Sequence, residues 1–148
     1  MSPANLYRLT SRDRTGKGAP SNGAAVSSIR ETAEQFFVAC ETGLGWDGCQ
    51  SYCHEGATFS AQAGRLEGVD TVEGYTEWMT ELLILLPDGD AEIRSFAVDD
   101  ERHNVAVYGV FRGTLSTGKK VAADYVYVMD FGGDRIRHMT KIWNDGWV

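Results

Sequence analysis

Two pairs of ionisable residues near the end of the chain could carry chemistry. Tyr127 and Lys141 stand among aromatic and aliphatic neighbours. A lysine in apolar surroundings has its charged form disfavoured and can act as a base or nucleophile, and a tyrosine hydroxyl can donate to a carbonyl or enolate oxygen. A lysine that reaches the rim and a tyrosine that only packs are the structural alternatives. Asp124 and His138 form a second pair, of the type used in general acid–base catalysis.

The spacing of these residues is that of a hairpin. Residues 121–131 and 136–143 are rich in β-forming side chains and flank a Gly132-Gly133-Asp134 turn. Successive side chains of a strand point to opposite faces, so Tyr127 and Lys141 are assigned to one face of the hairpin and Asp124 and His138 to the other. Asp124 and His138 turn inward only if the register shifts by one residue; otherwise we expect them to make interface contacts.

The preceding elements predict an α+β domain. A capping box, Ser28-x-x-Glu31, predicts the start of a first helix that ends near Gly43, and short helical and strand patterns follow at 47–54 and 57–63. A third helix is expected from about Asp70 to Pro87, before strands at 91–98 and 105–115. Helices followed by an antiparallel meander are typical of the α+β class.

Composition limits the partners. The net charge of −7 argues against nucleic acid and anionic membranes, although residues 1–25 are basic and rich in Gly and Ser, which predicts a flexible tail before a single domain at 26–148. No apolar run approaches the ~20 residues of a membrane span. The number of cysteines is odd, which favours free thiols and a cytoplasmic location; they are Cys40, Cys49 and Cys53. Cys49 and Cys53 beside His54 supply too few ligands for a typical zinc site, so no metal is expected.

Two segments carry a family resemblance: WDGCQSYCHEGATFSA, from helix to strand, and DYVYVMDFGGDRIRHMTKIW at the end. In this element order they resemble the nuclear transport factor 2-like superfamily, and within it the SnoaL-like group that includes polyketide cyclases. The resemblance implies a cone-shaped fold in which three N-terminal helices pack on a curved, mostly antiparallel sheet around an apolar pocket. It also implies a homodimer formed through the outer face of the sheet.

The resemblance tests the catalytic residues. Ketosteroid isomerases of this superfamily use a tyrosine and two aspartates, and the matching positions here hold Phe37, Ala61 and Tyr127. Steroid isomerisation by that mechanism is therefore not expected. The same alignment, and not spacing, suggests a set of pocket residues for binding a ligand. They are Phe37, Phe59, Trp78, Tyr108, Arg112, Tyr125, Met139 and Trp143.

Two functional hypotheses follow. The first is a cofactor-independent isomerase, cyclase or dehydratase that acts on a small, mostly apolar carbonyl compound, with Tyr127, Lys141 and, in the shifted register, Asp124 and His138 as catalytic groups. The second is a non-catalytic module of the same fold that binds a small molecule or forms a dimer. Neither requires a metal, a cofactor, nucleic acid or a membrane.

Overall fold

The computed structural model describes residues 24–62 and 64–143, with side chains from Ile29 onward. Most of the predicted tail, residues 1–23, lies outside the described residues. The elements follow one another as α1 (Ala24–Glu41), α2 (Gly45–Cys49), η3 (Gln50–Tyr52), β1 (Cys53–Ala61), η4 (Gly64–Leu66), α3 (Val72–Leu85), β2 (Asp90–Asp99), β3 (Asn104–Thr114), β4 (Lys120–Gly132) and β5 (Arg135–Trp143).

The five strands form a single sheet in the order β1-β5-β4-β3-β2. The pairs β2–β3, β3–β4 and β4–β5 are antiparallel, and β1 pairs with β5 in parallel. The meander of consecutive strands explains the antiparallel part. The first strand, β1, lies at one edge beside the last, β5, and α3 connects it to β2 at the opposite edge. The expected α+β class with a curved, mostly antiparallel sheet is confirmed.

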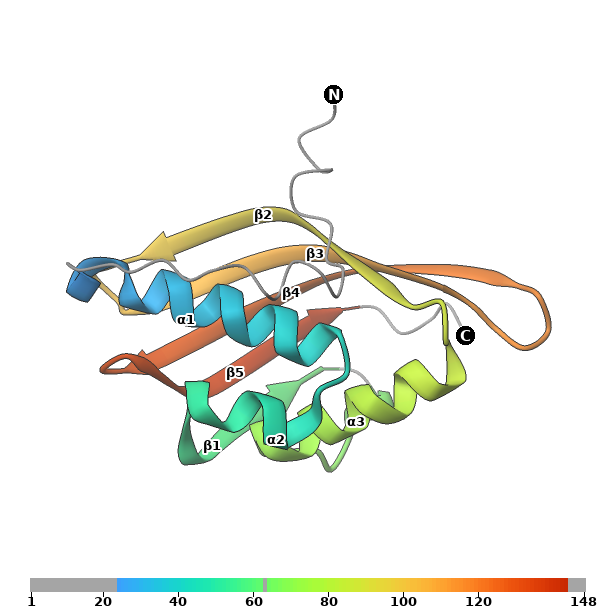
Figure 1. Cartoon of the computed structure of the whole chain (residues 1–148), viewed down its shortest axis with the longest axis horizontal. Coiled ribbons are helices and arrows are strands. Elements are labelled where there is room, and N and C mark those ends of the chain that lie inside the picture. The colour runs from blue at the N-terminus through green and yellow to red at the C-terminus, as the bar shows by residue number, and fades with distance from the viewer. Residues whose placement is uncertain (1–23, 63, 144–148) are drawn as a thin grey trace.

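The helices cover one face of this sheet. Figure 1 shows α1 lying across the strands, with α2 and α3 beside β1. Phe36 and Phe37 of α1 are fully buried, as are Met129 of β4 and Met139 of β5. The space between α1, α3 and the covered face of the sheet is the interior of the cone.

Several predicted boundaries were wrong. Helix α1 begins at Ala24 and not at Ser28, because the alanines before Ser28 are strong helix formers that extend the helix past the capping box. Strand β1 begins at Cys53, where the second helix was expected to continue. The N-cap of α3 is Thr71, whose side chain accepts a hydrogen bond from the Gly74 amide at 3.0 Å, and not Asp70. None of the described helices is long and apolar enough to cross a membrane.

Candidate active site

A buried carboxylate stands at the end of α1. Glu41 is the last residue of the helix and points into the cone, where its side chain is almost wholly enclosed. The Tyr125 hydroxyl donates to Glu41 Oε1 at 2.8 Å, and the Tyr127 hydroxyl donates to Oε2. Two tyrosines from β4 therefore satisfy the two oxygens of one carboxylate that is removed from water.

A buried amine stands across the interior. Lys141 of β5 is 4% exposed, and its Nζ donates to the hydroxyl of Tyr75 at 2.9 Å. Tyr75 comes from α3 and is hydrogen-bonded in turn to the hydroxyl of Tyr127. Among the described residues, no carboxylate lies within 4.0 Å of Lys141 Nζ, so the amine reaches Glu41 only through tyrosine hydroxyls.

These contacts form one continuous line, which we call the Lys141–Glu41 chain: Lys141, Tyr75, Tyr127 and Glu41. Each tyrosine has a single hydroxyl proton. Because Tyr127 donates to Glu41 and Lys141 donates to Tyr75, the proton between the two tyrosines must belong to Tyr75. If Glu41 held the proton and Lys141 were neutral, every donor could reverse without any heavy atom moving. The same geometry thus fits both proton arrangements.

Aromatic rings surround the Lys141–Glu41 chain. The Nζ atom of Lys141 lies 4.1 Å from the centroid of the Trp143 ring, 5.1 Å from Tyr75 and 5.2 Å from Trp78. Phe59 stacks on Tyr75 with centroids 4.6 Å apart, and Phe37 packs against Tyr127 at 5.5 Å. The faces of these rings can stabilise a cation, and their bulk excludes the water that would otherwise solvate one.

Burial moves the pKa values of the two ionisable ends toward each other. Removal from water raises the pKa of Glu41, against the opposing effects of Lys141 and of the tyrosine hydrogen bonds. The same loss of solvent lowers the pKa of Lys141 from 10.5 to about 8, although the Glu41 charge opposes this shift. Both shifts favour the neutral forms, so burial narrows the gap that separates the two pKa values in water.

The structure places most of the predicted pocket residues in the interior. Tyr127 and Lys141 share the inward face, as strand alternation together with the family resemblance predicted. The predicted ligand-binding residues that share this space are Phe37, Phe59, Trp78, Tyr125, Met139 and Trp143. Their orientation agrees with the prediction, while their roles in binding and catalysis stay predictions.

Asp124 and His138 lie on the opposite face, so the shifted register that would have turned them inward is wrong. Asp124 accepts a hydrogen bond from the Tyr108 hydroxyl at 2.8 Å. The two ring nitrogens of His138 lie 2.7 Å from Thr58 Oγ1 and 3.2 Å from Ser60 Oγ, on neighbouring β1. These two residues cannot act with Tyr127 and Lys141 as an acid–base pair in the cone.

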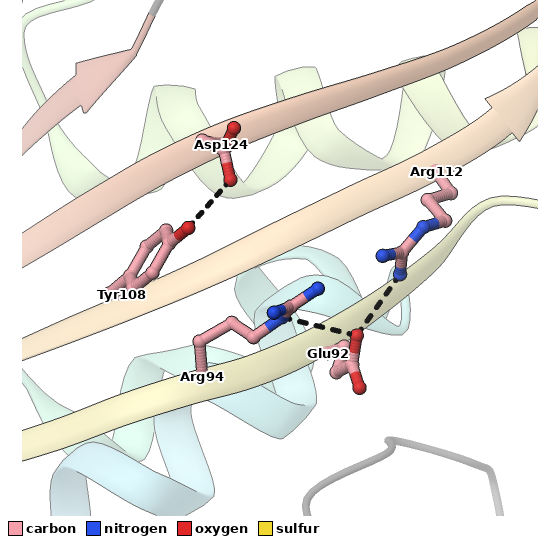
Figure 2. A network of polar contacts seen from close by, with 5 residues as sticks. All are labelled: Glu92, Arg94, Tyr108, Arg112 and Asp124. Atoms are coloured by element: carbon pink, nitrogen blue, oxygen red, sulfur yellow. Dashed lines mark hydrogen bonds and ion pairs between the residues drawn. The ribbon is translucent and has the colours of Figure 1, made fainter. Parts of the chain in front are cut away.

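Tyr108 and Arg112 were also expected to line the pocket, and this was wrong. Both project from the outer face of β3, where Figure 2 shows them with the helices behind the sheet. Arg112 donates to Glu92 at 3.1 Å, and Arg94 pairs with the same carboxylate at 3.4 Å. The residues of β3 that face the interior are the alternate set, Val105, Val107, Gly109 and Phe111.

Sequence reasoning missed two members of the site. Neither Glu41 nor Tyr75 was among the residues predicted to bind a ligand or to act in catalysis. A signal for Glu41 was present: it is an acidic residue one turn beyond Phe37 on the apolar stripe of the first helix. Burial of an unpartnered carboxylate is costly, so such a residue implies donors nearby.

The cysteines and His54 do not form a metal site. All three thiols are free and buried, and Cys53 Sγ donates to the Cys49 carbonyl at 3.7 Å. His54 Nε2 lies 2.7 Å from the Gly132 carbonyl, on the outside. Within the described part of the chain, no three His, Cys, Asp or Glu side chains are grouped so that they could hold a metal ion.

Comparison with known proteins agrees with this geometry. The family model of the SnoaL-like domain matches residues 33–139, which is well over half of the chain and includes all of β4 and the first part of β5. The chain belongs to the SnoaL-like domain family. The matched region holds Glu41, Tyr75 and Tyr127, whereas Lys141 lies two residues beyond its end.

Solved structures show how widely this SnoaL-like fold occurs. A protein described as a SnoaL-like polyketide cyclase from Jannaschia sp. CCS1 has a TM-score of 0.66 at 14% identity, covering 85% of this chain and 92% of its own. BvnE pinacolase from Penicillium brevicompactum has a TM-score of 0.68 at 11% identity, and the alignment covers 87% of this chain and 91% of the pinacolase chain. AusH from Aspergillus nidulans has a TM-score of 0.64 at 14% identity, and the alignment covers 85% of this chain and 88% of the AusH chain. No curated protein matches the sequence. At these identities the structures establish the fold alone.

Proposed function

We propose that this SnoaL-like domain is a cofactor-independent enzyme that moves protons on a small, mostly apolar carbonyl compound, in an isomerisation, cyclisation or dehydration. The observation that supports the proposal best is the Lys141–Glu41 chain, which joins a buried amine to a buried carboxylate through two tyrosine hydroxyls. A structural core rarely holds such groups, because apolar residues of similar size are usually at least as stable.

The Lys141–Glu41 chain can supply both a base and an acid in one step. With Lys141 neutral and Glu41 protonated, the amine takes a proton from the carbon next to the substrate carbonyl. The proton on Glu41 passes to Tyr127, that of Tyr127 passes to Tyr75, and that of Tyr75 reaches the carbonyl oxygen. The product is the enol, and Lys141 and Glu41 are left charged. Reprotonation at another carbon, or loss of a β-hydroxyl as water, completes the reaction.

The surroundings favour this chemistry for two reasons. The apolar walls weaken the competition of water for the developing charge on the substrate oxygen, so the hydroxyl donors are more effective than in solution. The aromatic rings also offer flat apolar faces against which a small unsaturated compound can pack. The descriptions of a polyketide cyclase and a pinacolase among proteins of this fold are compatible with such a role.

The test is exchange of carbon-bound hydrogen. We would incubate the protein with the apolar ketone 2-tetralone in deuterated water and follow the loss of the α-proton signals by NMR. We expect faster exchange than in buffer, and a reduction of about 100-fold or more in Glu41→Gln and in Lys141→Met, within the range of general acid–base contributions. The matched controls Glu55→Gln and Lys120→Met change exposed residues and should exchange at the wild-type rate. Equal rates in all five proteins would refute the proposal.

A second candidate function has its own support. Tyr75 and Tyr127 are fully buried, and every hydroxyl of the Lys141–Glu41 chain already has a partner within the protein. This packing suits a non-catalytic module in which the polar network fixes the fold. Binding of 2-tetralone without accelerated exchange would favour that reading.

We also propose a homodimer formed through the outer face of the sheet, and a cytoplasmic location. Support for the dimer comes from Ile142 of β5, an apolar side chain that is 51% exposed at this face, and from exposed Tyr108 of β3, which lies in the same row of the ladder with Val126 of β4 between them. Three free thiols support a reducing compartment.

A further inference from the structure

Lys141 is placed to do more than accept a proton. Its Nζ donates a hydrogen bond to Tyr75 Oη, and five aromatic ring centroids lie within 6 Å of it, those of Tyr75, Trp78, Tyr125, Tyr127 and Trp143. No carboxylate of a described residue lies within 4.0 Å of Nζ, so no direct ion pair holds it as an ammonium ion. Because burial lowers the pKa of Lys141 to about 8, a minority of this lysine is neutral at neutral pH and a larger share above pH 8, and the neutral amine is the state that attacks carbon.

The rings differ in exposure, and this defines a side of approach. Tyr75, Tyr125 and Tyr127 are buried, whereas Trp78 and Trp143 are partly exposed and pack edge to face with centroids 6.1 Å apart. The two indoles therefore stand between the amine and solvent. A flat carbonyl compound that displaces the edge of Trp143 would reach Nζ without disturbing Glu41.

We propose that Lys141 forms an imine with an aldehyde or ketone. The lone pair of Nζ bonds to the carbonyl carbon, and the electron pair of the C=O bond moves to oxygen, which takes a proton while the nitrogen loses one. The resulting carbinolamine hydroxyl is protonated and leaves as water while the nitrogen lone pair forms the C=N bond, which gives the protonated imine. Loss of the remaining nitrogen proton, which replaces the one taken by the departing hydroxyl, gives the imine. One water is released and no oxidant or reductant is consumed.

The Lys141–Glu41 chain can serve both proton transfers. Tyr75 lies 2.9 Å from Nζ and can take the proton that the nitrogen loses, and it can return a proton to the departing hydroxyl. Tyr127 and Glu41 behind it act as a reservoir. The protonated imine, a cation, withdraws electrons from the neighbouring carbon more strongly than a carbonyl, so the adduct in that form would accelerate the same removal of the α-proton.

This inference rests on the proposed function in one respect, the admission of a carbonyl compound to the cone. The experiment is reductive trapping. The protein is incubated with benzaldehyde and sodium cyanoborohydride, and the modified lysines are located by peptide mass mapping. We expect labelling at Lys141 to exceed that at Lys120 by at least about 10-fold at neutral pH, since burial lowers the pKa of the Lys141 ammonium and leaves it deprotonated more often than an ordinary lysine. Lys141→Met should lose this adduct, and Lys120→Met should keep it.

The pH profile supplies a second measurement that does not depend on any variant folding. Labelling at Lys141 should rise with pH, with a midpoint near its pKa of about 8. Labelling at Lys141 no greater than at Lys120 would overturn the inference. Accelerated α-exchange that depends on Lys141 but leaves no trapped adduct would do the same and leave the proposed function standing. A trapped adduct at Lys141 without accelerated α-exchange would support the imine and refute the proposed function.

Discussion

At the scale of single residues, the most informative property is the cost of burying Lys141. Its folded pKa of about 8 lies below its unfolded value of 10.5. The unfolded chain therefore binds more protons between these values, and this residue's contribution to the free energy of unfolding rises with pH in that window. Below about pH 8 Lys141 is protonated in both the folded and the unfolded protein, and the full free-energy cost of burying the charged amine remains.

We predict that wild-type protein gains stability relative to Lys141→Met as the pH is raised. From pH 8 to about 9.5 the difference in unfolding free energy should grow by about 2 kcal/mol, at 1.36 kcal/mol per pKa unit. Denaturant titrations of the two proteins across this range measure it. A difference that stays constant with pH would mean that Lys141 is solvated in the folded state.

A second residue-scale prediction concerns the hydroxyl of Tyr127. Tyr127→Phe removes a donor to Glu41 and an acceptor for Tyr75, and both lie where water cannot replace it. We expect a loss of about 1–3 kcal/mol in unfolding free energy, the cost of leaving buried polar groups unpaired.

The matched control is Tyr108→Phe, which also removes one tyrosine hydroxyl from a hydrogen bond with a carboxylate. Tyr108 is 37% exposed and water can take over its bond to Asp124, so the change should stay within about 0.5 kcal/mol. Chemical denaturation of both variants provides the comparison. Similar losses in the two variants would show that the buried chain has no special energetic role.

At the scale of elements, β3 controls the position of a tyrosine on β4. Gly109 is opposite Tyr125 in the ladder, and a Cβ atom added there would lie 3.1 Å from the Tyr125 hydroxyl and ring, and 3.2 Å from the Glu92 carbonyl. The absence of a side chain thus leaves the space in which Tyr125 reaches Glu41. The face of β3 that bears this glycine must therefore be the inner one.

We predict that Gly109→Ala displaces Tyr125 and weakens its hydrogen bond to Glu41. The expected cost is about 1–3 kcal/mol, typical of overpacking in a dense interior, together with a change in near-UV circular dichroism from the displaced ring. Gly64→Ala is the control, because a Cβ atom at Gly64 meets nothing within 4 Å. An unchanged melting temperature and spectrum in Gly109→Ala would contradict this account of the strand.

The same strand shows where sequence reasoning failed. On β4 and β5 the tyrosines, methionines and lysine alternate with smaller or charged residues, so parity gave the correct faces for Tyr127 and Lys141. On β3 the resemblance assigned the larger side chains Tyr108 and Arg112 to the pocket, because nothing in the sequence shows that a glycine makes room for a residue of the next strand. Tertiary packing decided that face.

The partners of Glu41 could not be predicted for a similar reason. Its hydrogen bonds cross 84 and 86 positions in the chain, from Tyr125 and Tyr127 on β4. Local periodicity could place Glu41 on the inner side of α1, but only the packing of α1 against the sheet brings those hydroxyls to its two oxygens. The chemistry of the site thus depends on contacts of very high sequence separation.

At the scale of the whole molecule, the outer face of the sheet is the surface that we propose for dimerisation. Placing a charge at the exposed Ile142 should separate the copies, because a self-complementary interface brings the same residue into the contact twice. Ile142→Arg is therefore predicted to be monomeric under conditions where the wild type is dimeric.

Ile84→Arg is the matched control. Ile84 is 76% exposed near the end of α3, away from this face, and its replacement should leave the mass unchanged. Size-exclusion chromatography with light scattering measures all three proteins. A monomeric wild type, or loss of the dimer in Ile84→Arg alone, would exclude the proposed interface.

The central claim is that Lys141 and Glu41 act as one coupled pair inside the cone. NMR titration of the Lys141 side chain, assigned through Lys141→Met, tests it most directly. We predict a pKa of about 8 in the wild type and a still lower pKa in Glu41→Gln, since the Glu41 charge holds the lysine pKa up. A pKa near 10.5, or one that Glu41→Gln leaves unchanged, would contradict the account.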